Sequence, residues 1–383
     1  MKKNIDITIF GNGIIGYTLA ISLLKIGYSV ALVESTEEKN TSKEQILFIN
    51  YKSEKFLRNL GILQKIDPKY YKTYKEIEII FEKINISLSA KLLKISHLGF
   101  LIESNKIKKA AKRILKKQKN FFVFNFHSIR KIYKKNNFWK ILVHKKLKIF
   151  SNIIVGADGK ESYIRDFFNF DFVKIQYKQC CILITVRIYG NYKKKIWQFF
   201  DYCEIYACLP IRKNYFLLIF YTDRKKIKIF KKKSLLFFKK KISKKFFLEN
   251  KKFFIKKISF HNLYFQNSLS FIKNGIFLIG DAAHTFHPFF GQGLNFSIQE
   301  IQNISKILKK KSNYSINQKK ILNTYQKMQR KKTIFMQFFI NSMYFLFNKK
   351  SGIFNFLKFF IFFVLKKKKK AKKFLLKFFS GIY

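Results

Sequence analysis

A glycine turn near the N-terminus, set between an apolar run and a helical pattern, leaves this chain few possible folds. The pattern G-x-G-x-x-G occupies Gly11–Gly16, after an apolar run at 5–10 and before helical apolar spacing at 17–26. A second apolar run follows at 29–33, and Glu34 stands directly after it. These elements predict one βαβ unit, because they have the order and spacing of a dinucleotide-binding fingerprint.

Each residue of this fingerprint has its own physical role. Gly11 permits the tight turn, Gly13 permits close approach of a pyrophosphate, and Gly16 permits close packing of the helix on the strand. Glu34 is placed to accept hydrogen bonds from a ribose hydroxyl. The alternative is an ordinary tight turn of an α/β protein, which the acid at the end of the second run disfavours.

A longer motif, GDAAHTFHPFFGQGLN, occupies Gly280–Asn295. It follows an apolar run at 275–279 and precedes a helical pattern, so it again predicts strand, loop and helix. Asp281 can accept hydrogen bonds from hydroxyl groups, and Gly291 and Gly293 allow the main chain to approach a flat ring. The helix that follows offers unpaired N–H groups and the positive end of its dipole to negative charge.

A third turn, Gly156–Arg165, follows a short predicted strand at 153–155. Asp158 lies on this glycine-flanked turn, where a carboxylate can meet polar groups of a cofactor, and Arg165 can fix the turn. The alternative, which stays open, is a helix capped at its N-terminus after a strand.

The net charge of the chain is extreme, but it is spread evenly. Of 383 residues, 79 are Lys or Arg, nearly all of them lysine, and the formal net charge is +58. Lysine, isoleucine, phenylalanine and asparagine are abundant together, which is typical of an AT-rich coding sequence. Because the lysines form no single patch interleaved with aromatic residues, we expect no specific nucleic-acid binding. Attraction to an anionic membrane surface is the partner class that the charge favours.

One apolar segment near the C-terminus is a candidate for membrane contact. Phe359–Leu365 is too short to span a bilayer, and Lys366–Lys370 follows it. Such a segment either lies in the interface beside anionic lipid or packs as an ordinary helix on the protein body. The N-terminus shows no secretory signal. We therefore expect a cytoplasmic protein, or one held peripherally on the inner face of the cell membrane.

Metal binding and catalysis by protein side chains have little support. His284 and His287 are three residues apart, but no third ligand cluster accompanies them, so a structural hydrogen bond is the preferred interpretation. Without a Ser-His-Asp set, paired carboxylates or a P-loop, the chemistry is expected to come from a cofactor. The cysteines lack zinc-like spacing and are expected to be buried thiols. They are Cys180, Cys181, Cys203 and Cys208.

Apolar patterning divides the chain into parts. Alternating apolar segments dominate residues 173–270 and predict an antiparallel sheet. A nucleotide-binding domain is expected on both sides of it, with a first part at 1–172 and a second at 271–330. Some strands around 76–103 are expected to belong to the antiparallel sheet. Residues 331–383 are expected to form a C-terminal helical segment.

With the three motifs in this order, the chain resembles the FAD-dependent aromatic hydroxylases, and more closely their ubiquinone-biosynthesis branch. Gly11–Gly16 with Glu34, Gly156–Arg165 and Gly280–Asn295 carry the resemblance, which extends over nearly the whole chain. It implies an α/β fold with a Rossmann-like, GR2-type FAD-binding domain. An interleaved antiparallel β-sheet substrate domain and a helical C-terminus complete the implied fold.

The resemblance also implies an activity. Members of this family are monooxygenases that reduce FAD with NADH or NADPH, form a flavin hydroperoxide with O₂ and hydroxylate an aromatic ring. The implied substrate is a polyprenylated phenol, and the implied partners include other quinone-biosynthesis proteins. No catalytic side chain is implied, but His287 and Pro288 would line the flavin site. The implied cofactor-binding residues are Gly11, Gly13, Gly16, Glu34, Asp158, Gly280, Asp281, Pro288, Gly291, Gly293, Leu294 and Asn295.

The chain departs from the family pattern at several positions. Gln45 and Asn105 stand where the family commonly has arginines, and a nearby lysine such as Lys106 replaces an arginine only as a point charge. Ser297 and Glu300 stand where the family has Gly and Asp. A non-catalytic scaffold and a related FAD enzyme that reduces an isoprenoid lipid therefore stay open as alternatives. The ring position, prenyl length, choice of nicotinamide donor and oligomeric state leave no trace in the sequence.

Overall fold

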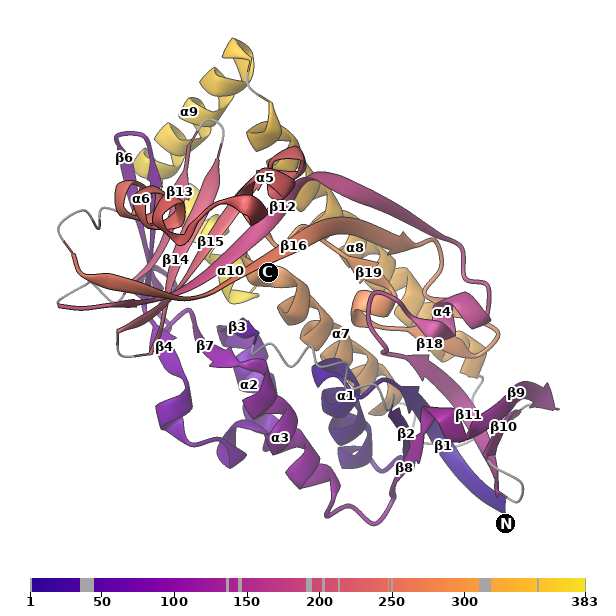
Figure 1. Cartoon of the computed structure of the whole chain (residues 1–383). Coiled ribbons are helices and arrows are strands. Elements are labelled where there is room, and N and C mark those ends of the chain that lie inside the picture. The colour runs from indigo at the N-terminus through magenta and orange to yellow at the C-terminus, as the bar shows by residue number, and fades with distance from the viewer. Residues whose placement is uncertain are drawn as a thin grey trace.

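The fold is described from a computed structural model. Two large sheets lie at opposite ends of the molecule, with long helices beside and between them (Figure 1). The structure describes residues 2–34, 45–135, 138–143, 147–190, 195–201, 204–212, 214–246, 248, 251–309, 318–349 and 351–382.

The first sheet is mainly parallel. In spatial order it contains β17 (Ile272–Lys273), β18 (Ile276–Leu278), β11 (Leu147–Gly156), β1 (Lys2–Phe10), β2 (Val30–Glu34) and β8 (Phe121–Asn125), while β10 (Phe138–Val143) pairs with β11 and β9 (Ile129–Lys135) pairs with β10. β1 pairs in parallel with β2 and β11, and β11 pairs in parallel with β18. β2 and the carboxyl ends of β1 and β11 are mostly apolar and buried, because both faces of the sheet are covered there.

Helices cover one face of the parallel sheet, and their apolar side chains share one core with Ile7 and Ile9. They are α1 (Ile14–Lys25), α2 (Tyr51–Asn59), α3 (Ser104–Leu115), α7 (Gln292–Lys309) and α8 (Gln318–Asn348). The short α4 (Tyr163–Phe167) packs on the opposite face, where Ile164 joins the core around Phe10. Helix α1 directly follows the first glycine turn, so that turn lies at the edge of the sheet.

The second sheet is mainly antiparallel. Its order is β19 (His284–Thr285), β16 (Phe253–Ser268), β12 (Phe172–Ile188), β15 (Tyr215–Asp223), β14 (Ile205–Arg212), β13 (Ile196–Phe200), β5 (Glu76–Phe81) and β6 (Ile84–Ser89). β5 pairs with β13 in parallel, and the other pairs are antiparallel. A small third sheet of β3 (Ile46–Asn50), β7 (Gly99–Glu103) and β4 (Lys72–Tyr74) lies between the large ones.

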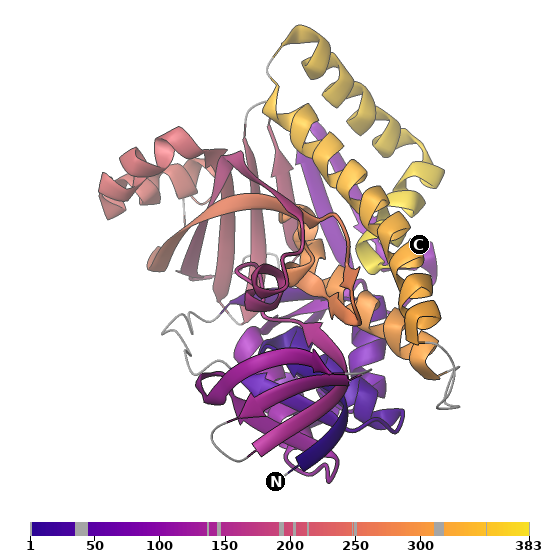
Figure 2. The ribbon, with the colours of Figure 1, turned by 90° about the vertical axis from the view of Figure 1, so that its right-hand side faces the viewer.

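Helices cover both faces of the antiparallel sheet (Figure 2). One face packs against α5 (Ile227–Lys232) and α6 (Leu235–Lys245), and the other packs against α8, α9 (Gly352–Lys367) and α10 (Lys369–Ser380). In the part of the chain that the structure describes, no helix has the length and apolar character needed to cross a bilayer. Cys180, Cys181 and Cys208 are buried, as predicted, and Cys203 lies outside the described residues.

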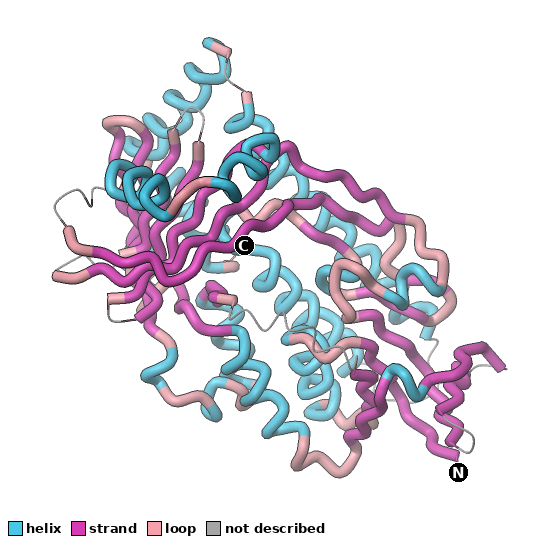
Figure 3. The backbone as a smooth tube through the Cα atoms, viewed as in Figure 1, coloured by secondary structure: helices cyan, strands magenta, loops and turns pink. Residues whose placement is uncertain are grey.

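The predicted fold class is confirmed, and several details differ from the predicted division (Figure 3). Within 173–270 the structure has two helices, α5 and α6, which sequence patterning missed because lysine tracts dilute their apolar stripe of Phe230, Phe238 and Ile242. β5 and β6 join the antiparallel sheet, but β7 belongs to the small sheet. Helix α8 runs without a break through the predicted boundary between 330 and 331.

Candidate cofactor site

The three predicted loops meet at one edge of the parallel sheet. They follow β1, β11 and β18, which are neighbours and point the same way, so their carboxyl ends coincide. The amide of Ala157 donates a 2.8 Å hydrogen bond to the Phe10 carbonyl, and the amide of Ile279 donates a 2.9 Å bond to the Gly156 carbonyl. Motifs that are 269 residues apart in sequence (11 to 280) therefore become adjacent.

Close backbone packing explains two of the glycines. A Cβ on Gly11, which has φ +125°, would lie 2.3 Å from the Ala157 carbonyl oxygen, and a Cβ on Gly16 would lie 1.9 Å from the Gly11 carbonyl oxygen. Both distances are far inside van der Waals contact. These glycines let the first turn pack on the second turn and on its own helix. Gly280 lies near the same helix, because its Cβ would be 3.5 Å from Ile15 Cγ2.

Other glycines face open space. Among the described residues, no heavy atom lies within 4 Å of a Cβ built on Gly13, Gly159 or Gly293, apart from their chain neighbours and, for Gly293, its own helix backbone. Gly13 is the N-cap of α1, which has no side-chain cap and no acid in its first turn. Within the described residues, neither a capping side chain nor an acid of the first turn occupies the positive end of α1, which fits a bound pyrophosphate. The residues present fit a dinucleotide at this position.

Asp281 is exposed, and among the described residues no donor is hydrogen-bonded to its carboxylate. Surrounding protein nevertheless displaces much of its solvent, and this desolvation raises the pKa of its carboxyl group, while the positive charges of His284 and Lys160 act to lower it. An accessible carboxylate crowded by protein is suited to accept hydrogen bonds from ligand hydroxyls.

The two other predicted acids already have protein partners. Glu34 accepts a 2.7 Å hydrogen bond from the Tyr17 hydroxyl, and its carboxylate lies 3.8 Å from Lys112 Nζ. Asp158 accepts from the Ser162 hydroxyl at 2.5 Å and from the Ile164 amide at 3.1 Å, one bond to each oxygen. Asp158 therefore stabilises the N-terminus of α4, which is the alternative that the sequence left open. Glu34 is only partly buried and keeps one oxygen without a protein hydrogen bond among the described residues.

The beginning of α7 is clamped to the small sheet by Asn295. Its side-chain oxygen accepts from the Asn50 amide at 2.9 Å, and its side-chain nitrogen donates to the carbonyls of Phe48 at 2.8 Å and Gly291 at 3.1 Å. The side chain is fully buried and both of its N–H donors are used within the protein. Leu294 is half-buried in the core of the parallel sheet. The Asn295 carbonyl accepts from the Ser53 hydroxyl at 3.5 Å.

The segment before α7 reaches the antiparallel sheet. The Tyr221 hydroxyl donates to the Pro288 carbonyl at 3.0 Å, and His287 Nε2 is hydrogen-bonded to Gln179 Oε1 at 3.1 Å. Burial lowers the pKa of His287 to about 3, so its ring is neutral at physiological pH. Among the described residues, the rings of Tyr177, Tyr221, Phe289 and Tyr344 lie around His287.

Glu300 is the supporting residue that sequence reasoning missed. This fully buried carboxylate accepts from the Gly280 amide at 3.0 Å and from the Tyr325 hydroxyl at 3.0 Å, and it lies 3.1 Å from His284 Nε2. It orients the backbone of the Gly280 turn from within α7. The available signal was an acid on the apolar face of the predicted helix.

Arg165 fixes the second turn, as predicted. Its side chain is almost fully buried and donates to the carbonyls of Lys160 at 2.9 Å and Ala282 at 3.5 Å, so it joins the second turn to the third. Asn105 is one of the positions at which the chain differs from the family pattern, and Lys106 follows it. Lys106 Nζ lies 3.7 Å from the Tyr70 ring centroid. Lys106 therefore places its cation on Tyr70, and Asn105 is half-buried beside it.

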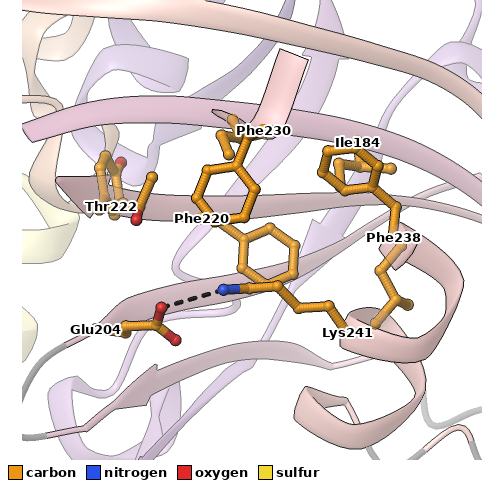
Figure 4. A pocket seen from close by; sticks show the side chains of 10 residues that line it. Ile184, Glu204, Phe220, Thr222, Phe230, Phe238 and Lys241 are labelled. Carbon is orange, nitrogen blue, oxygen red and sulfur yellow. Dashed lines mark hydrogen bonds and ion pairs between the residues drawn. The ribbon is translucent and has the colours of Figure 1, made fainter. Parts of the chain in front are cut away.

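A pocket away from these loops lies between α5, α6 and the antiparallel sheet (Figure 4). Phenylalanine side chains line it, and Lys241 Nζ forms a 3.1 Å ion pair with Glu204 at its edge. None of the residues that line it belongs to the three loops, so the pocket is a packing feature of the outer face of the sheet. In the described part of the chain, no group of three or more potential ligand side chains is arranged for a metal ion.

Known proteins share these features. The model of the family described as FAD binding domain matches residues 143–334. The chain is 24% identical over 311 residues to 3-demethoxyubiquinol 3-hydroxylase of Escherichia coli, covering 79% of each chain. It is 21% identical over 354 residues to the mitochondrial ubiquinone biosynthesis monooxygenase COQ6 of Drosophila melanogaster, covering 78% of this chain and 73% of that protein.

Solved structures share the fold. The crystal structure of p-nitrophenol 4-monooxygenase PnpA from Pseudomonas putida superposes with a TM-score of 0.76 and 15% identity, covering 99% of this chain and 98% of that one. The family match spans half of this chain, and the three loops converge at the sheet edge. The chain therefore belongs to the FAD binding domain family and is a flavin-dependent monooxygenase with FAD as its cofactor.

Proposed function

We propose that this protein hydroxylates the aromatic ring of a polyprenylated phenol in ubiquinone biosynthesis, with NADH or NADPH as electron donor and O₂ as oxygen source. The convergence of the three loops at one sheet edge is the observation that carries the proposal. The 3-demethoxyubiquinol hydroxylase and COQ6 relatives supply the substrate class. We expect the protein in the cytoplasm or on the inner face of the cell membrane.

In this proposal the cofactor lies along the sheet edge. The open N-terminus of α1 at Gly13 holds the pyrophosphate, and Glu34 accepts from the ribose with its remaining oxygen. Asp281 accepts from the ribityl hydroxyls or lies beside the phosphates. The open backbone at Gly293 and the first turn of α7 would hold the flavin, and the dipole of α7 would stabilise negative charge on it.

The chain's own groups position and shield the reaction. FAD, when bound, supplies the electron transfer from the nicotinamide donor and the activation of O₂. His287 is neutral, and burial raises the pKa of the Tyr177 and Tyr221 hydroxyls, so the described groups beside Pro288 carry no charge at neutral pH. This aromatic cluster excludes water from the end of the site that faces the antiparallel sheet.

The experiment measures FAD binding and oxygen transfer with purified protein. We expect FAD to bind, and ¹⁸O₂ to be incorporated into a short-chain prenylated phenol when NADH or NADPH is supplied. Asp281→Ala should abolish FAD retention without loss of folding, whereas the exposed Asp171→Ala serves as a matched control with unchanged flavin content.

Three results would contradict the proposal. Failure of the wild-type protein to bind FAD would favour a non-catalytic scaffold, the reading supported by Gln45 and Asn105 in place of arginines. Reduced prenyl double bonds without added oxygen would favour a reductase of isoprenoid lipids. Unchanged flavin content in Asp281→Ala would refute the role of this carboxylate.

A further inference from the structure

Helix α9 exposes many of its apolar side chains, whereas a lysine in its middle is buried. Lys358 is fully buried and donates to the Lys349 carbonyl at 2.7 Å and to the Asn355 side chain at 3.3 Å. Phe362 on the same side stacks on Phe81 of the antiparallel sheet at 4.4 Å. A helix at the surface of a globular protein has the opposite arrangement, with its charged face in water.

The outward side of α9 is a continuous apolar surface. Ile353 is 75% exposed, Phe356 is 68% exposed and Phe360 is 52% exposed. The ring of Phe345 on α8 lies 5.4 Å from that of Phe354, so the surface continues onto α8. We call these side chains the α8–α9 face: Ile334, Phe338, Phe345, Ile353, Phe356, Leu357, Phe359, Phe360 and Phe363.

The size of this face calls for a partner. Each half-exposed phenylalanine contributes roughly 100 Å² of apolar surface, so the face amounts to several hundred Å². A contiguous apolar surface of this size marks a site of contact with protein or membrane. Helix α9 lies beside the antiparallel sheet, at the end of the molecule away from the parallel sheet (Figure 1).

The charge around the face identifies the partner as anionic. Lys366 and Lys367 end α9 and Lys368–Lys370 follow them, and all five are exposed, as are Lys373 and Lys377 on α10. The sequence contains no Asp or Glu after Glu300. A second copy of this chain is a poor occupant, because its own lysines would meet these at close range. Apolar rings bordered by lysines match the acyl boundary and the headgroups of an anionic bilayer.

We propose that the α8–α9 face docks the protein on an anionic lipid bilayer, with the phenylalanines in the acyl boundary and Lys366–Lys370 at the headgroups. Helix α9 lies in the interface and does not cross it. Helix α9 packs on β5 through the stacked rings of Phe362 and Phe81. Docking through α9 therefore places the bilayer beside the antiparallel sheet. Vesicle binding requires no turnover, so this inference stands or falls separately from the substrate proposed above.

The first test is flotation of the full-length protein with vesicles of phosphatidylcholine alone or mixed with phosphatidylglycerol. We expect binding to the anionic vesicles that weakens as NaCl rises from about 0.01 M to about 1 M, because salt shortens the screening length. Phe356→Ser with Phe360→Ser should weaken binding roughly tenfold or more, since the inserted area is lost. The matched control is Leu235→Ser with Leu236→Ser, an equally exposed apolar pair on α6, which should bind as wild type.

Charge is tested separately from apolar contact. Two triple variants carry the same charge change at opposite ends of the molecule, and only the first should lose affinity for anionic vesicles. They are Lys366→Gln, Lys367→Gln and Lys369→Gln on the C-terminal side, and Lys131→Gln, Lys134→Gln and Lys135→Gln on β9. Equal loss in both would show attraction by net charge alone and would overturn the docking geometry.

Insertion is measured in variants that keep the apolar character. Phe360→Trp should show a blue-shifted emission and quenching by brominated lipid when vesicles are added, whereas Leu236→Trp should show neither. Equal quenching at both positions, or none at Phe360→Trp, overturns the proposal. A wild-type dimer in sedimentation that Phe356→Ser with Phe360→Ser dissociates, without vesicle binding, would instead assign the face to a second copy.

Discussion

At the scale of single residues, glycines of one fingerprint are required for different reasons. Gly16 is needed by the folded chain itself, because a Cβ would overlap the Gly11 carbonyl oxygen. Gly13 has no such neighbour among the described residues and has an ordinary φ of −79°. The sequence pattern includes both glycines in one motif. Only their surroundings show that Gly16 is required for folding, whereas Gly13 leaves room for a ligand.

The two glycines therefore give opposite predictions. Gly13→Ala should change the free energy of unfolding without FAD by less than about 0.5 kcal/mol and weaken FAD binding roughly tenfold or more, because the methyl group projects toward the pyrophosphate. Gly16→Ala should lower the free energy of unfolding by about 2 kcal/mol or more through overpacking. Urea unfolding and flavin fluorescence titration measure the two effects. Equal destabilisation by both substitutions would contradict the assignment.

His287 predicts a pH dependence of stability. Burial lowers its pKa to about 3 in the folded protein, against about 6.5 in the unfolded chain, so the unfolded state binds more protons between these values. The stabilisation is fully present above pH 6.5 and is lost as pH falls toward 3. Between pH 7 and 5, His287→Gln should remove about 2 kcal/mol of the wild-type decrease in unfolding free energy. Parallel urea titrations at both pH values measure this, and an unchanged decrease in the variant would exclude His287 as its source.

At the scale of elements, one side of α9 packs on the antiparallel sheet and the other side is exposed to solvent. The ring centroid of Phe362 lies 4.4 Å from that of Phe81 and 5.3 Å from that of Phe200. The side chain of the adjacent Phe363 is 44% exposed. Sequence periodicity could not separate these neighbours, because phenylalanines occur on every side of α9. The contact with the antiparallel sheet decides which ring is buried.

This asymmetry predicts different effects of two adjacent substitutions. Phe362→Ala should cost about 3–5 kcal/mol and raise amide hydrogen exchange throughout α9, because it removes the anchor on the sheet. Phe363→Ala should leave exchange in solution unchanged within about 0.5 kcal/mol. Hydrogen-exchange mass spectrometry of α9 peptides distinguishes them, and similar protection in both variants would be incompatible with the described packing.

At the scale of the whole molecule, the net charge of +58 opposes the compact state. Raising NaCl from about 0.01 M to about 1 M shortens the screening length from about 30 Å to about 3 Å. We expect the free energy of unfolding to rise by on the order of 1 kcal/mol or more over this range. Urea unfolding at each salt concentration measures it, with choline chloride as a control for specific sodium effects. A fall in stability with salt would show that local ion pairs outweigh the overall repulsion.

Much of the nucleotide-binding half could be predicted from local pattern. The run at 5–10, the glycine turn and Glu34 correspond to β1, the α1 N-terminus and the end of β2. Each of these features depends on residues close together in the chain. A turn that needs glycine and a strand that is buried on both faces can be recognised from the residue pattern within about thirty residues. Arg165 was placed correctly for the same reason, because it fixes a turn only a few residues away.

The sequence by itself determined the strand, turn and helix units and the backbone chemistry of the three loops, because glycine geometry and apolar periodicity are local. Only the tertiary structure decided that Asp158 accepts from the Ile164 amide at the start of α4, that Asn295 bonds to the small sheet and that Glu300 supports the Gly280 turn. It also decided that α9 points its phenylalanines outward. A side chain's partner depends on which distant strand or helix packs beside it, and a chain position alone does not contain that information.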